Sequence, residues 1–246
     1  MPSKLVYNIG TLNRNSVYHA GTNQCVVSPV TNNLFNITTN FSMSAWVMPN
    51  NFVNNRFILS NTTSTNIAIA NGYTIYINTI PKAAFQVNTF GTGSIGASST
   101  AILGLNTWYH IMGVYNGVDA RVYLNGVLGD VITNGTGIVN TNSSATYQTG
   151  RLAAGTSSLN HFIGYIDEVS IWNIALTPSD AVKIYNGGRP LNLLTETNKN
   201  NLQSWWRMGE DDTYPIIRDA SNRGSVSGTM TNMTADNITS NTVRRL

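Results

Sequence analysis

The sequence predicts an all-β fold, a sandwich of two antiparallel sheets with one short helix. The first observation is a series of short apolar runs separated by Asn-Gly pairs and by clusters of Ser, Thr and Gly, a pattern typical of sandwiches and barrels. The second is the composition, because 41% of the 246 residues are hydrophobic and only 10% are charged. Asn, Ser, Thr and Gly must supply most of the polar surface, and these residues favour turns and sheet faces over long helices.

The predicted strands are runs in which apolar side chains alternate with polar ones or follow one another directly. They cover residues 16–27, 41–48, 56–61, 73–78, 83–88, 108–115, 120–124 and 162–172. An all-β chain of this length commonly forms one domain, so we expect a single core.

Residues 106–130 predict a meander of three strands. Asn125-Gly126 lies between two apolar runs, and an Asn-Gly pair favours a type I′ turn because both central residues need a positive φ. Asn116-Gly117 takes a similar place one strand earlier. Both faces of this ribbon are apolar. We therefore expect both faces to be covered, either by the second sheet and a long loop or by another subunit.

The one convincing helix signal lies between residues 177 and 187. Thr177 is a suitable N-cap, Pro178 suits the first helical position, and Gly187 suits the stop. We therefore expect a short helix near residues 178–186.

Several motifs occur in an order that resembles a known family. These motifs are FSMSAWV at 41–47, NTWYH at 106–110, VYLNG at 122–126, FIGYIDEVSIW at 162–172, ALTP at 175–178 and IYNG at 184–187. The order is similar to that of laminin-G-like, concanavalin A-like jelly-roll domains and spans residues 16–191. The resemblance implies a jelly-roll sandwich, and it implies that Trp46 and Trp108 belong to the packing.

The C-terminal segment departs from this pattern. Residues 202–235 contain LQSWWRMGE and resemble the element that more often opens such domains. We expect a permuted strand segment that completes its own sheet, the alternative being that it lies on a neighbouring copy. The predicted organisation is an extended N-terminal arm at 1–15, one jelly-roll domain at 16–235 and a C-terminal tail at 236–246.

The arrangement of these pieces also resembles structural proteins of marine bacteriophages. This resemblance implies a non-enzymatic virion surface protein, a capsid decoration or an appendage, assembled in the host cytoplasm and exposed outside the cell. Its expected partners are copies of itself, as a homo-oligomer, other virion proteins and cell-surface polysaccharide. The alternative is a carbohydrate-binding, lectin-like module of an adhesin or an extracellular protein.

The candidate interface residues are four large rings. Trp205 and Trp206 are adjacent in a predicted strand, so they must point to opposite faces, which suggests one buried ring and one outward or interfacial ring. Tyr115 and Tyr123 lie on the two-faced apolar ribbon. Contacts through these rings would carry the proposed assembly.

No catalytic residue and no cofactor is predicted. Asp167 and Glu168 are adjacent, so in a regular strand they face opposite ways and cannot form the close pair that retaining glycoside hydrolysis requires. We expect Asp167 to have a structural role, accepting backbone N–H groups from a neighbouring loop. The lone Cys25 predicts a buried, unreactive thiol.

No metal site is predicted either. The three histidines, His19, His110 and His161, are far apart and lack ligand spacing. Many relatives have two aspartates where this chain has His19 and Gln24, so an inherited structural calcium is possible but disfavoured. Asp211 and Asp212 predict a solvated acidic turn, which we prefer to a calcium site.

Charge and hydropathy argue against two further partner classes. The basic residues behind the net charge of +3 are scattered, which disfavours nucleic acid. No stretch reaches the length of a membrane span, and the first residues lack the apolar core of an export signal. We therefore expect neither a nucleic-acid partner nor a membrane partner.

Overall fold

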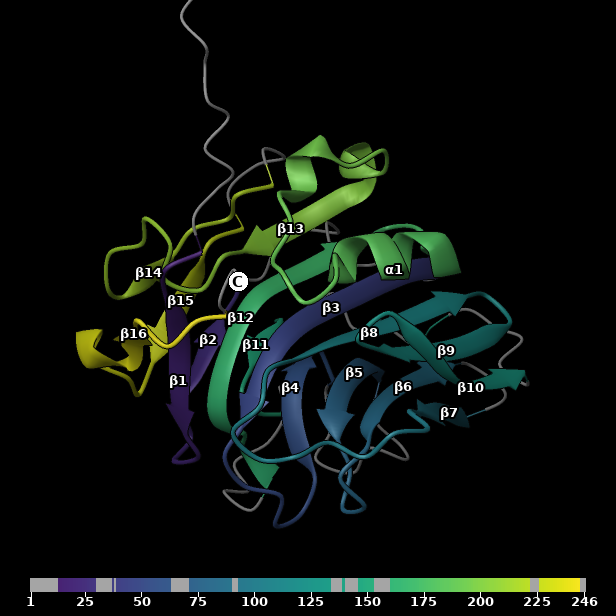
Figure 1. The fold of residues 1–246 in the computed structure, drawn as a ribbon, viewed down its shortest axis with the longest axis horizontal. Helices are drawn as coiled ribbons and strands as arrows, with labels where there is room; N and C mark the ends of the chain where they lie inside the picture. The colour runs from purple at the N-terminus through teal and green to yellow at the C-terminus, as the bar shows by residue number, and fades with distance from the viewer. Residues whose placement is uncertain are drawn as a thin grey trace, which may run out of the picture.

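The computed structural model describes residues 13–29, 37, 39–62, 71–89, 93–133, 139, 146–152, 160–221 and 226–243. Two antiparallel sheets of eight strands each pack face to face, as the sequence predicts (Figure 1). The sheet nearer the viewer is called the front sheet, and the other is called the back sheet.

The front sheet is built around two long central strands. Its order is β10 (Val127–Thr133), β9 (Asp119–Leu124), β8 (Tyr109–Asn116), β3 (Asn40–Pro49), β12 (Ile163–Trp172), β1 (Ser16–Ala20) and β16 (Ile238–Thr239), with β13 (Leu202–Trp206) also paired to β12. The back sheet runs β14 (Ile216–Ile217), β15 (Gly228–Thr231), β2 (Cys25–Val27), β11 (Gln148–Thr149), β4 (Arg56–Ser60), β5 (Gly72–Ile77), β6 (Ala83–Thr89) and β7 (Gly93–Ser98).

The main core lies between the two sheets. Phe41 of β3, Phe85 of β6 and Tyr115 of β8 meet there, with ring centroids 5.8 Å apart for both pairs that include Phe41. Gly113 packs directly against the Phe85 ring, and a Cβ atom at this position would overlap it. Cys25 is buried in β2 as a free thiol, as expected, and burial raises its pKa.

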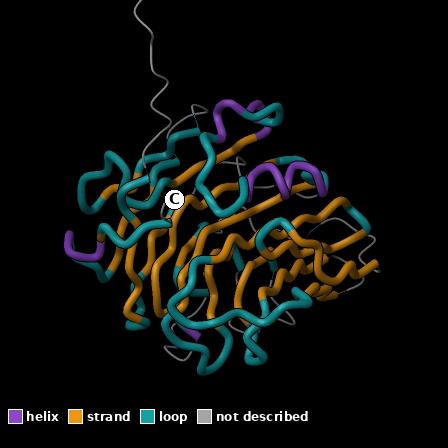
Figure 2. Tube along the Cα trace, viewed as in Figure 1, coloured by secondary structure: helices purple, strands orange, loops and turns teal. Residues whose placement is uncertain are grey.

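A second apolar layer covers part of the outer face of the front sheet. Helix α1 (Pro178–Tyr185) and the turns η2 (Leu193–Thr195) and η3 (Lys199–Asn201) pack there, toward the upper end of the sheet (Figure 2). Leu176, Ala181 and Leu193 of this layer meet Met112 of β8. The cover expected for the second apolar face thus comes from the chain's own helix and loops.

The local predictions for the hairpin and the helix are confirmed. Asn125 and Gly126 have φ values of 52° and 75°, and Leu124 pairs with Val127 across the turn. The Thr177 side chain accepts the Asp180 N–H, while the Asp180 carboxylate accepts the Thr177 N–H in return. This reciprocal capping box starts α1 where the sequence indicates.

The C-terminal segment completes both sheets of its own chain. Strand β13 pairs with β12 in the front sheet, and β15 pairs with β2 in the back sheet. The expected free tail at 236–246 is wrong for its first part, because η4 (Ala235–Asn237) leads into β16, which pairs with β1. Val243 is buried as well.

The predicted N-terminal arm lies mostly outside the described residues. The Asn13 amide donates to Asp167, and the Asn15 amide donates to the Gly209 carbonyl, so the described end of the arm contacts the domain. No helix in the described ranges is both long enough and apolar enough to cross a bilayer.

Candidate functional site

The four predicted interface rings are buried within the chain. Trp205, Trp206, Tyr115 and Tyr123 are 2%, 1%, 0% and 1% exposed. Trp206 and Tyr115 belong to the core between the sheets, whereas Trp205 and Tyr123 belong to the layer under α1. The two tryptophans do face opposite ways, but the expectation of an outward ring is wrong because the helix and its following loop cover the outer face.

The Trp205 indole belongs to a buried polar cluster around Glu168. The Trp205 Nε1–H donates to Glu168 Oε2 at 2.6 Å, and Arg207 Nε donates to Glu168 Oε1 at 3.3 Å. Asp167 accepts the Asn13 amide at 2.7 Å and the Glu168 N–H at 2.8 Å. The cluster therefore joins the N-terminal residues, β12 and the C-terminal segment.

A bulge in β12 places both acidic residues in this buried region. The register against β3 shifts between Asp167 and Ser170, and Glu168 has a φ of 46°. Strict alternation fails at such a bulge, so the expectation that Asp167 and Glu168 face opposite ways does not hold. Neither carboxyl group lies in an open cleft, because both residues are buried. Asp167 has a structural role, but its donors are the Asn13 side-chain amide and the N–H of Glu168, and not the backbone N–H groups of a neighbouring loop that were expected.

Burial governs the ionisation of both carboxyl groups. Burial, opposed by Arg207, raises the pKa of Glu168 from 4.5 to about 7. Burial and the neighbouring Glu168 carboxylate raise the pKa of Asp167 well above its ordinary value. A buried carboxyl group resists ionisation because the charged form loses its hydration.

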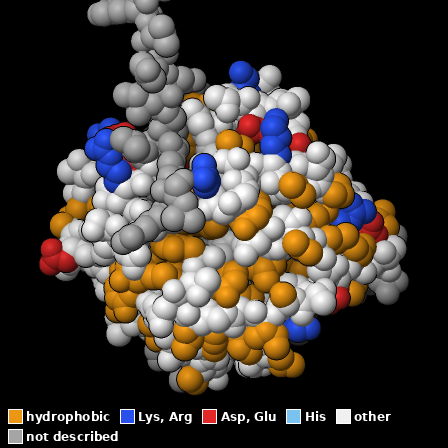
Figure 3. Space-filling view, in the orientation of Figure 1, with side chains coloured by type: hydrophobic (Ala, Val, Ile, Leu, Met, Phe, Trp, Pro, Cys, Tyr) orange, Lys and Arg blue, Asp and Glu red, His pale blue; other side chains and the backbone are white. Residues whose placement is uncertain are grey.

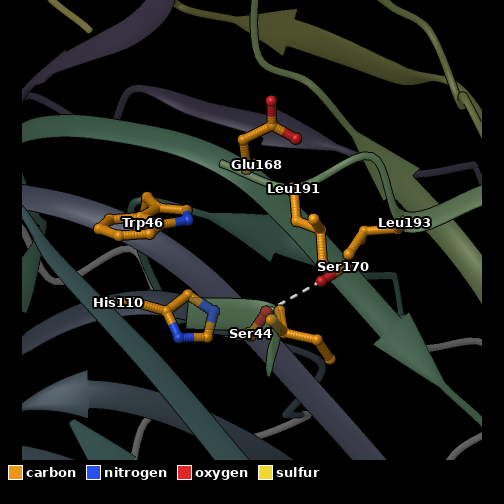
Figure 4. Close-up of a pocket in the computed structure, with 8 residues that line it drawn as sticks. Ser44, Trp46, His110, Glu168, Ser170, Leu191 and Leu193 are labelled. Carbon is orange, nitrogen blue, oxygen red and sulfur yellow. Dashed lines mark hydrogen bonds between the residues drawn. The ribbon is translucent and has the colours of Figure 1, made fainter. Parts of the chain in front are cut away.

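A small cavity adjoins this cluster (Figure 4). It has a volume of about 10 Å³ and lies beneath α1 and residues 191–193. Its lining residues are Ser44, Trp46, His110, Glu168, Ser170, Ile184, Leu191 and Leu193. The Ser44 and Ser170 hydroxyls bond at 2.9 Å across it. A space of this size holds about one water molecule, so it cannot hold a sugar.

The histidines are separate and structural. His19 Nε2 lies 3.1 Å from the Thr149 hydroxyl in the interior, and His110 packs beside Trp46 and Tyr185, with ring centroids 5.2 and 6.4 Å away. Burial lowers the pKa of each of these two groups from 6.5 to about 3. Among the described residues, no three His, Cys, Asp or Glu side chains gather as metal ligands.

The open part of the front sheet carries a row of aromatic side chains. Tyr18 of β1 and Tyr165 of β12 have ring centroids 4.9 Å apart, and Tyr165 and Trp108 have centroids 6.4 Å apart. Met48 of β3 pairs with Tyr165 in the register and lies between the two strands that carry these rings. We call Tyr18, Tyr165, Met48 and Trp108 the aromatic row.

The three rings of the aromatic row are half-buried, and the Trp108 Nε1 atom is buried without a hydrogen-bond partner among the described residues. The partial exposure of Trp108 corrects the expectation that it belongs to the packing, whereas Trp46 is buried as expected and stacks on Tyr185 at 5.8 Å. Figure 3 shows hydrophobic atoms gathered over the lower parts of β1 and β12.

Amide groups border the aromatic row. The Asn50 amide donates to Asn106 Oδ1 at 2.7 Å, and Asn106 is two residues from Trp108. The Asn237 amide donates to the Tyr18 carbonyl at 2.8 Å. The arrangement presents apolar ring faces beside hydrogen-bonding groups, as small-molecule sites commonly do.

A second open feature is an apolar groove of about 450 Å³. It lies between residues 99–102 and the start of β10, and Tyr109, Leu124 and Asn125 line its floor. Ile102 and Val127 on its walls are 61% and 68% exposed. It offers fewer aromatic faces than the row, since Tyr109 is the only ring in its lining.

The sequence analysis missed Tyr18 and Tyr165 as site residues. Each lies in a predicted strand, but their neighbourhood depends on which strands pair and in which register. Two sequence features together could have indicated this site. Trp108 has an outward position on the ribbon, and two other predicted strands contain a tyrosine.

Comparison with known proteins places the fold in a family. A family model described as the concanavalin A-like lectin/glucanases superfamily matches residues 20–182. The chain belongs to this family. The mouse (Mus musculus) protein pappalysin-1 is 30% identical over 115 residues, which is 45% of this chain and 7% of the length of pappalysin-1.

Two solved structures show the same fold at low sequence identity. One is a candidate carbohydrate-binding protein from Bacteroides ovatus, with a TM-score of 0.66 and 18% identity over 92% of this chain and 60% of that chain. The other is the module CBM40 of the IT-sialidase from Ruminococcus gnavus, bound to α2,3-sialyllactose. It has a TM-score of 0.57 and 8% identity over 72% of this chain and 98% of that chain.

Proposed function

We propose that this chain is a lectin-like carbohydrate-binding module and that the aromatic row holds the glycan. The observation that carries the proposal is the group of three half-buried rings, with adjacent centroids 4.9 and 6.4 Å apart, on an open sheet face. Sugar rings present apolar C–H faces that pack on aromatic rings, while their hydroxyl groups need hydrogen-bond partners. The amides of Asn50 and Asn106 are positioned at the border to supply them.

The structural neighbours support this class of function. The Bacteroides ovatus and Ruminococcus gnavus proteins are carbohydrate-binding according to their descriptions. The likeness is one of fold, so the assignment to this chain depends on its own aromatic row.

The experiment is glycan-array screening of the full chain, followed by calorimetry with the strongest ligand. Trp108→Ala and Tyr165→Ala each remove one face of the row, and we expect each to weaken binding about tenfold, which is ~1.4 kcal/mol. Val127→Ala in the groove is the matched control, because it removes an exposed apolar side chain outside the row. We expect it to bind like the parent.

Two results would count against this assignment. An array without signal above background would remove the lectin function. Loss of binding in Val127→Ala, with Trp108→Ala and Tyr165→Ala unchanged, would move the site to the groove. Thermal unfolding of each variant separates lost binding from lost folding.

The virion surface function stays a prediction from the sequence, as do its homo-oligomeric state and its location. Its four candidate rings are buried in this chain. These rings therefore do not support a virion surface function. A carbohydrate-binding module is the better supported proposal, and it applies equally to an adhesin, an extracellular protein or a particle that attaches to polysaccharide.

A further inference from the structure

We infer that the aromatic row binds an uncharged oligosaccharide, an inference that rests on the proposed function. It names the class of glycan, and two features carry it: the absence of charge at the surface of the row and the extent of the row across the sheet.

The surface of the row is neutral. Tyr18, Tyr165, Met48 and Trp108 carry no formal charge, and the side chains of Asn50 and Asn106 at its border are amides. In Figure 3 no acidic or basic atom is visible among the hydrophobic atoms over the lower parts of β1 and β12.

The charged groups nearest to the row along β12 are buried and bonded to other residues of the chain. Asp167, two residues from Tyr165, is fully buried and accepts the Asn13 amide. Arg207 is buried against Glu168. An anionic sugar on the row would therefore lose part of its hydration without gaining a cationic partner from these groups, and such a loss disfavours binding. A neutral sugar has no such cost.

The row is also longer than one sugar ring. It crosses β1, β12 and β3 to the start of β8, and with adjacent centroids 4.9 and 6.4 Å apart its outer rings lie up to about 11 Å apart, or about two strand spacings of 4.8 Å. The ring planes of Tyr18 and Tyr165 are inclined by 51°, and those of Tyr165 and Trp108 by 51°. Successive sugar rings must turn relative to one another to lie on these faces, so a linked chain fits the row better than a monosaccharide.

The test uses polysaccharides that differ in charge on a common backbone. Affinity electrophoresis and calorimetry would compare hydroxyethyl cellulose with carboxymethyl cellulose, dextran with dextran sulfate, and methyl-esterified pectin with de-esterified pectin. Any neutral oligosaccharide found on the array would be titrated beside its monosaccharide. We expect binding only to neutral members, tighter binding of the oligosaccharide, and affinity that changes by less than about twofold between low and high salt.

Thr107→Asp is the charge probe. Thr107 is exposed and adjacent to Trp108, so the substitution adds a negative charge beside Trp108 without removing an amide that the proposal assigns to binding. Affinity for a neutral glycan should stay within about twofold of the parent, because a neutral ligand has no net charge to repel.

The outcomes separate this inference from the proposed function. Binding only to the anionic members, weakened by salt and by Thr107→Asp, would overturn the neutral class while leaving a lectin. Equal affinity for the monosaccharide and the oligosaccharide would overturn the extended site. Failure of every probe and of the array would remove both proposals together.

Discussion

Replacing His110 with phenylalanine should change how stability depends on pH. His110 is 1% exposed, its Nδ1 has no hydrogen-bond partner among the described residues, and burial lowers its pKa from 6.5 to about 3. Between these values the unfolded chain binds a proton that the folded protein does not, so folding stability is fully present above pH 6.5 and is lost as pH falls. At ~1.4 kcal/mol per pH unit, His110 alone removes about 2 kcal/mol between pH 7 and pH 5.

The measurement is urea unfolding of the parent and His110→Phe at pH 7, 6 and 5, followed by tryptophan fluorescence. Phenylalanine keeps a ring packed beside Trp46 and Tyr185 but cannot take up a proton. The variant should gain about 2 kcal/mol relative to the parent between pH 7 and pH 5. Ile111→Val, at the next position in β8, is the control, with a cost of roughly 0.5–1.5 kcal/mol that is the same at each pH. A constant difference between His110→Phe and the parent across this range would refute the argument.

Three further substitutions test other parts of the structure by the same unfolding assay. Glu168→Gln should gain about 2 kcal/mol relative to the parent from pH 5 to pH 7.5, because burial raises the pKa of Glu168 to about 7 and the parent loses stability as this group ionises; a flat difference would contradict the raised pKa. Gly113→Ala should lower the free energy of unfolding by roughly 1–3 kcal/mol, since the new methyl group overlaps the Phe85 ring, and an unchanged value would show that the core yields there. Thr177→Ala removes the capping box of α1 and should cost about 1 kcal/mol, whereas Thr195→Ala, in the exposed turn η2, should cost less.

The sequence determined those parts of the fold that depend on neighbouring residues. The Asn125-Gly126 turn follows from the positive φ that both residues accept, and α1 follows from the reciprocal bonds of Thr177 and Asp180. The motif order was sufficient to predict the sandwich, since it samples strands of the front sheet in their chain order.

The positions that depend on distant segments were harder to predict. The directions of Trp205 and Trp206 follow from strand alternation, but their burial depends on α1 and on residues 187–202 folding over the sheet. Alternation itself fails at Glu168, where the bulge in β12 breaks the register. The aromatic row needs β1, β12 and the start of β8 to be aligned, and local sequence does not specify that alignment.

The outer face of the front sheet has two parts. One part is covered and stabilises the fold, and the other part is left uncovered. Along the upper part of the face, α1 and the loop after it bury Met112, Tyr123 and Trp205, and each square ångström of apolar surface buried there contributes roughly 25 cal/mol before the cost of ordering. The same sheet leaves Tyr18, Tyr165 and Trp108 half-buried although a longer loop could cover them. Uncovered apolar rings that lie together mark a surface used for contact. Because tyrosine hydroxyls can stay hydrated while the ring faces pack, the proposed binding of a neutral sugar would cost this surface little polar hydration.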